Sequence, residues 1–296
     1  MKEYKTSNDL EQAVKSAAIK TGRPTQIVQE EFWRSRLLAR IFSGGEPLFV
    51  LKGGTSILAR IPDARRTRDL DVFARSDSAD EVIAEIKELI EQDLGDFCRF
   101  DLITTERIKQ QTPSRQCFRL KFELQIGVRR VTSIMNLDLV LGCCPTADIE
   151  TMHPKNLEGF PLTNIEYPLY PLVDHIADKV CAIMEKHREN FESSRTKDLV
   201  DLCIIAANEP VSQQSLALAL KSESELRNLY PMAGFEIPKG WQSQSGRYQK
   251  LAKESKLGEE YSNQANAVCL LQSFINPALK ESTDEKTWNP ATHTWE

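Results

Sequence analysis

LKGGTSILARIPDARRTRDLDVF, residues 51–73, carries the densest signal for both fold and chemistry in the chain. A short apolar strand is predicted over 48–51, and Gly53 and Gly54 follow it directly. Apolar residues after the glycines indicate one or two helical turns, and a second strand is predicted over 69–73. The stretch therefore predicts a strand, a glycine turn, a short helix and a second strand in close succession.

Two carboxylates, Asp69 and Asp71, alternate on the second predicted strand. Because successive side chains of a strand point to opposite faces, both carboxylates lie on one face, about 6–7 Å apart. Mg²⁺ prefers oxygen ligands and takes the rest of its shell from substrate phosphates, so this spacing favours a metal-bound nucleotide. Asp138, on a strand predicted over 131–141, becomes a third ligand if that strand lies beside the strand predicted over 69–73.

Glycines and hydroxyl groups at a helix start are typical of phosphate-binding loops, because backbone N–H groups can approach an anion closely where no Cβ intervenes. Three arginines follow, enough to neutralise a triphosphate. The candidate phosphate-binding residues are Gly53, Gly54, Thr55, Ser56 and Arg66, with Arg65 and Arg68 as further cations. Each element alone also fits an ordinary structure, since paired glycines form turns and alternating aspartates occur on solvated strand faces.

The rest of the chain predicts an α+β fold, with a mixed sheet and flanking helices in a domain over 1–155 and a helical domain over 156–296. The pattern changes after Pro145 from alternating strands to helical periodicity. Helices are predicted at 8–21, 25–43, 78–94, 173–190, 194–208, 212–221 and 262–280, strands at 98–103, 117–126 and 131–141, and a C-terminal tail at 282–296.

Composition excludes several classes of protein. The 296 residues are 41% hydrophobic and 27% charged, which excludes disordered and collagen-like chains, and no apolar run approaches the ~20 residues of a membrane span. The polar N-terminus lacks the apolar core of a secretory signal, so a cytoplasmic protein without a membrane partner is expected. The net charge of −5 argues against nucleic acid. However, basic residues cluster at 107–130 and 239–256, and in the second cluster Trp241 and Tyr248 are available to stack on a base. Either cluster equally fits an ordinary solvated face.

Two resemblances follow from these motifs. The order of strand, GG[ST], DxD on a second strand and a distant Asp on a third resembles the active site of DNA polymerase β-like nucleotidyltransferases. ADKVCA at 177–182 and RTKDLVDL at 195–202, preceded by RLLARI at 36–41, resemble the AbiEii/AbiGii toxin nucleotidyltransferase family. That family includes toxins of type IV toxin–antitoxin systems and the related MenT-like toxins.

The second resemblance implies roles for individual residues. Asp69 and Asp71 would hold two Mg²⁺ ions, Lys179 would reach a nucleotide phosphate, and Asp198 would be a further catalytic carboxylate. Thr67 matches the small hydroxyl residue before the paired aspartates. Lys179 taken alone equally fits a surface lysine whose stem lies along apolar neighbours. Which of Asp138, Asp198 and Asp201 is the third essential carboxylate stays open, with Asp201 also fitting a packing or capping partner of the arginines.

The implied activity is an EC 2.7.7-type, Mg²⁺-dependent nucleotidyl transfer. The substrate would be a nucleoside triphosphate (NTP), the acceptor an RNA 3′ end, that of tRNA in particular, and the consequence a block of translation, with a cognate antitoxin as protein partner. Two other functions stay open. The same fold could transfer a nucleotidyl or phosphoryl group to a protein or a small molecule, or could bind a nucleotide without turnover.

Overall fold

The computed structural model divides the chain into two compact units, each made of separate chain segments. Unit 1 comprises Met1–Arg60, Thr67–Cys143 and Glu150–Leu169, and unit 2 comprises Ile61–Arg66, Cys144–Ile149 and Tyr170–Glu296. The residues that the structure describes are 4–44, 47–108, 115–185, 195–255, 257–280 and 285–296.

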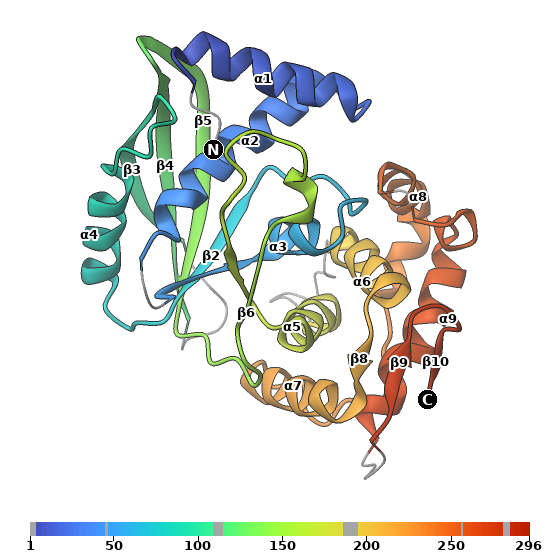
Figure 1. Cartoon of the computed structure of the whole chain (residues 1–296). Coiled ribbons are helices and arrows are strands. Elements are labelled where there is room, and N and C mark those ends of the chain that lie inside the picture. The colour runs from blue at the N-terminus through green and yellow to red at the C-terminus, as the bar shows by residue number, and fades with distance from the viewer. Residues whose placement is uncertain (1–3, 45–46, 109–114, 186–194, 256, 281–284) are drawn as a thin grey trace. The chain divides into compact units, whose positions relative to one another are not determined.

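Unit 1 contains a seven-stranded mixed sheet in its described residues (Figure 1). The strands are β1 (Phe49–Lys52), β2 (Leu70–Ala74), β3 (Cys98–Ile108), β4 (Gln116–Ile126), β5 (Arg129–Leu141), β6 (Glu150–Met152) and β7 (Tyr167–Leu169). Their order across the sheet is β3-β4-β5-β2-β1-β7-β6, with β5/β2 and β1/β7 parallel and the other pairs antiparallel. The predicted α+β class with a mixed sheet is confirmed, and β5 lies beside β2.

Helices cover one face of this sheet (Figure 1). They are α1 (Ser7–Lys20), α2 (Thr25–Ile41) and α4 (Ala79–Ile90), while the short helix α3 (Gly53–Arg60) follows β1 directly. Strand β4 shows why this face is the core: Leu120, Phe122 and Leu124 are fully buried in it and alternate with charged residues, as the sequence predicts. The charged residues of the same strand therefore lie on the opposite face.

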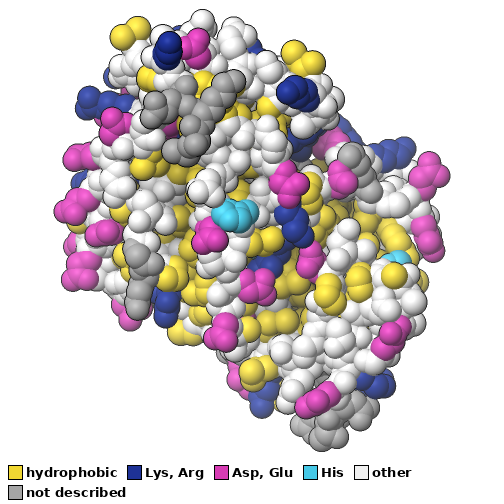
Figure 2. All heavy atoms as spheres, viewed as in Figure 1, with side chains coloured by type: hydrophobic (Ala, Val, Ile, Leu, Met, Phe, Trp, Pro, Cys, Tyr) yellow, Lys and Arg dark blue, Asp and Glu magenta, His cyan; other side chains and the backbone are white. Residues whose placement is uncertain are grey.

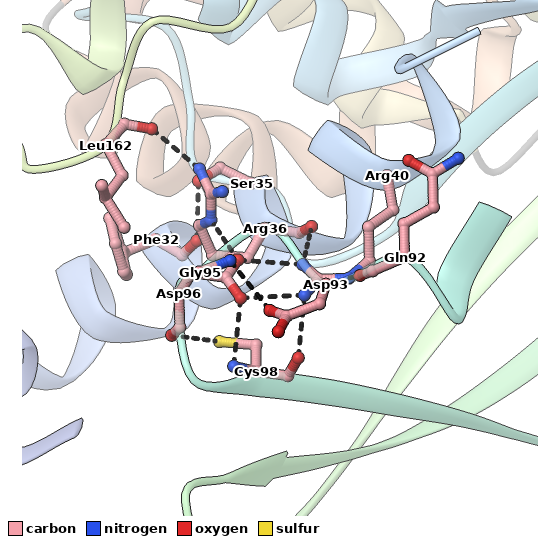
Figure 3. A network of polar contacts seen from close by, with 10 residues as sticks. All are labelled: Phe32, Ser35, Arg36, Arg40, Gln92, Asp93, Gly95, Asp96, Cys98 and Leu162. Carbon is pink, nitrogen blue, oxygen red and sulfur yellow. Dashed lines mark hydrogen bonds and ion pairs between the residues drawn. The ribbon is translucent and has the colours of Figure 1, made fainter. Parts of the chain in front are cut away.

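A buried cluster of charges joins α2 to the link between α4 and β3 (Figure 3). Arg36 Nε and Arg40 Nη1 both donate to Asp96 Oδ2, at 2.7 and 2.9 Å, and Arg40 Nη2 donates to Asp96 Oδ1 at 2.8 Å. Arg40 and Asp96 are fully buried. Burial alone would raise the pKa of Asp96, but hydrogen bonds and charges from the two arginines hold it below its usual value. One carboxylate thus compensates two buried guanidinium groups.

Unit 2 is mainly helical, as predicted. Its helices are α5 (Leu172–Met184), α6 (Thr196–Asn208), α7 (Gln213–Leu226), α8 (Ser245–Glu254) and α9 (Gln264–Ile275), and β8 (Val211–Ser212), β9 (Thr287–Asn289) and β10 (Thr294–Trp295) pair in the order β10-β9-β8. The end of the helix predicted at 173–190 lies outside the described residues. Short 3-10 helices occupy Lys155–Leu157 in unit 1 and Lys239–Gln244, Glu259–Ser262 and Asn276–Leu279 in unit 2.

The prediction of a C-terminal tail is wrong, because the end of the chain supplies part of the core of unit 2. Trp288 on β9 is fully buried, and its ring centroid lies 4.8 Å from that of Phe274. Its indole Nε1 also donates to the carbonyl oxygen of Ala206, at 2.7 Å. Two very short strands leave no periodic pattern in the sequence, so the buried tryptophan was the available signal.

The acidic residues of the chain gather in part on α4. The exposed side of this helix carries Asp80, Glu81 and Glu88, and Figure 2 shows acidic side chains along the same edge of unit 1. This helix accounts for part of the net negative charge. Among the residues that the structure describes, every helix falls short of the length or the apolar character that a bilayer crossing needs.

Candidate active site

The glycine turn between β1 and α3 makes room for a carboxylate. Gly53 has a φ of 65°, in the left-handed region that side chains other than glycine rarely adopt. A Cβ atom at this position would lie 1.9 Å from Asp71 Oδ2, far inside van der Waals contact. Residue 53 is therefore glycine for two separate reasons, its backbone conformation and the approach of the Asp71 side chain.

The paired aspartates lie where β2 begins. Leu70 and Val72 are fully buried in the core, so Asp69 and Asp71 point to the opposite side of the sheet. Asp69 is exposed and Asp71 is half-buried. Thr55 Oγ1 donates to the main-chain carbonyl oxygen of Asp69 at 2.9 Å, which ties the start of α3 to the start of β2. The phosphate-loop and metal-ligand candidates of unit 1 are thus adjacent.

Charged residues form a row across four neighbouring strands. Lys52 on β1 pairs in register with Asp71 on β2, Asp71 with Asp138 on β5, and Asp138 with Arg119 on β4. Directly opposed residues of neighbouring strands point to the same face, so all four belong to the side away from the helix-covered core. Two carboxylates stand side by side in this row, with one cation at each end.

Arg119 forms an ion pair with Asp138 that involves both carboxylate oxygens. Arg119 Nε donates to Asp138 Oδ1 at 2.8 Å and Arg119 Nη2 donates to Asp138 Oδ2 at 2.7 Å. These hydrogen bonds, together with the negative charges of Asp138 and Asp69, raise the pKa of Arg119, so the guanidinium stays charged. Asp138 therefore lies beside the paired aspartates Asp69 and Asp71, but its carboxylate already has a cation, Arg119, as its partner.

The residues of unit 1 fit a divalent cation in part. Asp69 and Asp71 offer carboxylate oxygens, the ligand type that Mg²⁺ prefers, and the missing Cβ of Gly53 leaves the space in which the Asp71 carboxylate lies. Among the described residues, no group of three His, Cys, Asp or Glu side chains is arranged to hold a metal ion as it stands. A cation bound by Asp69 and Asp71 would take its other ligands from water and substrate phosphate.

A small pocket next to Asp69 contains an arginine that the sequence reasoning missed. Arg34 on α2 lines it together with Thr55, Thr67 and Asn156. Arg34 has no hydrogen bond or ion pair with any residue that the structure describes, and burial lowers its pKa although Glu31 and other nearby acids partly offset this. The signal in the sequence was an arginine that directly follows Phe32 and Trp33 in the amphipathic helix α2.

The lysine predicted to be catalytic lies inside unit 2 and is buried, not at the surface. Lys179 Nζ on α5 donates to Asp198 Oδ1 at 2.6 Å and to Asp201 Oδ2 at 2.7 Å, both on α6. Arg65 also donates to Asp201 Oδ2, at 2.8 Å. Burial lowers the pKa of Lys179, but the two carboxylates outweigh it and the net shift is upward.

The three arginines that follow the glycine turn, Arg65, Arg66 and Arg68, differ in burial and in their partners. Arg65 is nearly buried and is committed to Asp201, as the sequence reasoning allowed for that aspartate. Arg66 belongs to the same segment of unit 2 and is exposed. Arg68 belongs to unit 1, where its exposed guanidinium lies 3.8 Å from the Glu30 carboxylate. The three arginines therefore have three different surroundings.

The two basic segments differ from the expectation. Trp241 and Tyr248 are fully buried in unit 2, so the expectation that these rings are available to stack on a base is wrong. In the other segment, acidic residues of unit 1 pair with most of the described cations. These pairs are Arg119–Asp138, Lys121–Glu106, Arg129–Glu11 and Arg130–Glu123. Residues 109–114 and 256 of the two segments lie outside the described residues.

Comparison with known proteins yields one family and a small set of similar structures. The family model described as "Nucleotidyl transferase AbiEii toxin, Type IV TA system" matches residues 36–268. The crystal structure of JHP933 from Helicobacter pylori is 16% identical, with a TM-score of 0.48, and the match covers 86% of this chain and 93% of that one. A second H. pylori chain with a nucleotidyltransferase description has the same identity and TM-score, over 86% of this chain and 96% of its own. The curated proteins gave no significant match.

Proposed function

Because the chain belongs to the AbiEii family of nucleotidyl transferase toxins of type IV toxin–antitoxin systems, we propose that it transfers a nucleotidyl group from an NTP to the 3′ end of an RNA, with tRNA as the acceptor. The observation that carries the proposal is the close approach of Gly53 to Asp71, which seats a carboxylate against a glycine turn at the start of a helix. The family implies NTP as substrate and an antitoxin as partner. Extension of tRNA at its 3′ end would stop charging and hence translation.

The proposed reaction forms a bond between the acceptor 3′ oxygen and the α-phosphorus of the NTP, while the bond to the bridging oxygen breaks and pyrophosphate leaves. The hydroxyl proton passes to solvent or to a carboxylate of the site. Asp69 and Asp71 would hold Mg²⁺, as two ions, which supplies charge stabilisation for attacking and leaving oxygens. Gly53, Gly54, Thr55 and Thr67 would bind phosphate oxygens, with Arg34 and Arg66 as cations, whereas the side chain of Ser56, the other predicted phosphate ligand, is fully buried in α3. Asp138 would be a further ligand.

The test incubates the protein with tRNA, Mg²⁺ and each NTP labelled at the α-phosphate. We expect labelled RNA that is longer than the input, because the α-phosphate remains on the acceptor. Total RNA, run in parallel, identifies an acceptor other than tRNA. Label on the protein alone would instead support transfer to a protein. Binding of NTP without any labelled product would support a nucleotide-binding module, and either result contradicts the proposal.

Lys179 and Asp198 are proposed as catalytic residues because of the family resemblance. The structure adds that Lys179 should also contribute to the stability of unit 2. Replacing Lys179 with Met leaves two buried carboxylates: Asp201, which keeps its hydrogen bond from Arg65, and Asp198, whose Oδ2 lies 3.5 Å from the exposed guanidinium of Arg195. Removal of one partner from a buried ion pair costs about 3–5 kcal/mol. We therefore expect K179M to lose RNA extension and also to lower the free energy of unfolding by about 3 kcal/mol.

Chemical denaturation and the RNA assay together check this prediction. Lys197, exposed on the same helix as Asp198, provides the matched control, because K197M removes an equal charge without disturbing the buried cluster. The assay is run at a temperature at which K179M is fully folded. Activity that survives in folded K179M would remove Lys179 from the reaction, and an unchanged unfolding free energy would contradict the structural part.

A further inference from the structure

Arg119 lies at one end of the row of charged residues that includes Asp71 and Asp138. Two nitrogens of its guanidinium, Nε and Nη2, contact the same side chain, that of Asp138. Its two hydrogen bonds, 2.8 and 2.7 Å long, occupy both oxygens of Asp138. Asp138 is opposite Asp71 on the neighbouring strand, and Asp69 is close enough to Arg119 to raise its pKa. The guanidinium of Arg119, with its single positive charge, therefore already occupies the Asp138 carboxylate beside Asp69 and Asp71.

A guanidinium and a divalent cation compete for the same lone pairs of a carboxylate. While Arg119 holds both oxygens, Asp138 has reduced capacity to bind a metal ion, and its charge is neutralised. Asp69 and Asp71 are then the carboxylates of this face that Arg119 does not hold through its hydrogen bonds. When Arg119 leaves, the Asp138 carboxylate loses its hydrogen-bonded cation, and its oxygens can join those of Asp71, directly opposite on the neighbouring strand, as ligands of a divalent cation.

Arg119 can leave its partner at a moderate cost. Its side chain is 44% exposed, whereas that of Asp138 is 20% exposed, so the arginine is the half of the pair that reaches solvent. Glu106, directly opposite Arg119 on β3, accepts a hydrogen bond from Lys121 at 2.8 Å. The exposed guanidinium is well suited to a phosphate group, which it can bind through two parallel hydrogen bonds.

We propose that Arg119 is a positioning residue that keeps Asp138 from binding a divalent cation until a phosphate group of the bound NTP draws the guanidinium away. The site then gains a cation between Asp71 and Asp138 only when substrate is present. This inference rests on the proposed function for the identity of the substrate, but the competition between Arg119 and the cation at Asp138 does not require any transfer reaction.

The first experiment measures Mn²⁺ binding to the full chain by electron paramagnetic resonance, without NTP or RNA. We expect R119Q to bind Mn²⁺ at least ten-fold more tightly than the wild type, or to bind one more ion, because Asp138 is released. The double variant R119Q/D138N should return to the wild-type value. Circular dichroism confirms that each variant is folded, and R119K, which keeps the charge but loses the fork, should lie between wild type and R119Q.

Lys121 provides the matched control. It lies two residues further along β4, on the same face, and is paired with Glu106 instead of Asp138. K121Q removes the same charge from the same strand, so it reports the general electrostatic effect on Mn²⁺ binding. An R119Q effect equal to that of K121Q, or one that persists in R119Q/D138N, overturns the proposal.

The second experiment adds phosphate ligands to the wild type and to D138N. A non-hydrolysable NTP analogue should raise the number of Mn²⁺ ions bound by the wild type by one more than in D138N. An RNA that ends in a 3′-deoxynucleotide tests the other source of phosphate, and should give no such difference. A difference produced by the RNA alone, or by neither ligand, overturns the release of Arg119 by NTP. Both readouts are independent of RNA labelling, so failure of the proposed function is seen separately.

Discussion

Replacement of Asp71 with Asn is expected to lower RNA extension by about a thousand-fold or more while leaving the protein folded. The change keeps the shape of the side chain but removes its negative charge, and with it one of the two ligands of the proposed Mg²⁺ site. Charge stabilisation by a catalytic metal is worth several kcal/mol, and ~1.4 kcal/mol corresponds to a factor of ten in rate. Asp71 lies between Lys52 and Asp138 in the row of charged residues, so the loss of its charge removes an attraction as well as a repulsion, and stability should change by no more than about 1 kcal/mol.

The measurement compares single-turnover RNA extension with thermal melting of the same preparation. Asp77 provides a matched control, since it is exposed in the loop that follows β2 and is not one of the three aspartates of the proposed site, Asp69, Asp71 and Asp138. D77N should retain wild-type activity. Mn²⁺ binding should weaken in D71N and remain unchanged in D77N. More than a tenth of wild-type activity in D71N would place the metal elsewhere.

Replacement of Asp96 with Asn is expected to have the largest effect on stability. Arg36 and Arg40 would keep their charges in the core but lose the carboxylate that contacts both (Figure 3). Removing one partner of a buried ion pair costs about 3–5 kcal/mol. Other contacts hold the two arginines in place, among them hydrogen bonds from Arg40 to the carbonyl of Cys98 and from Arg36 to that of Leu162. The guanidinium groups therefore cannot move to water without wider rearrangement.

Urea denaturation of D96N and of the control D93N checks this expectation. Asp93 is an exposed neighbour whose side chain accepts a hydrogen bond from Gly95 N–H, so D93N should cost less than about 1 kcal/mol. Similar losses of unfolding free energy in the two variants would show that the buried cluster contributes little.

The same variant predicts a change in pH dependence. The folded-state pKa of Asp96 is lowered, so its stabilising contribution is complete above its unfolded pKa of about 4 and is lost as the pH falls through the folded value. The wild type should therefore lose part of its advantage over D96N in acid. A difference between the two proteins that stays constant down to pH 2 would contradict this assignment.

The strands and the paired aspartates could be predicted because they follow local rules. Strict alternation in 117–126 identified β4, and the position of Asp138 on a neighbouring strand made its approach to Asp71 a stated condition that the register satisfies. The partners of charged residues could not be predicted in the same way. Nothing in the sequence near Asp138 indicates that Arg119 contacts it, since that contact depends on strand pairing across a hairpin.

Burial was the property that sequence reasoning judged least well. Trp241 and Tyr248 stand among lysines and serines, which suggested an exposed stacking surface, yet both side chains lie in the core of unit 2. Arg40 stands in an amphipathic helix and is also fully buried, because Asp96 supplies a counter-ion 56 residues away. Long-range compensation of this kind leaves no periodic signal in the chain.

The interleaving of the two units has a consequence for synthesis on the ribosome. Strand β1 pairs with β7 through Leu51 and Leu169, so the sheet of unit 1 is incomplete until well over half of the chain has been made. The ion pair of Arg65 forms later still, because its partner Asp201 is translated 136 residues after it. A nascent chain cut short before α6 would therefore lack both the finished helical unit and the counter-ion of its own arginine. For a protein of a toxin family, this order of assembly would delay any activity at least until α6 has been translated.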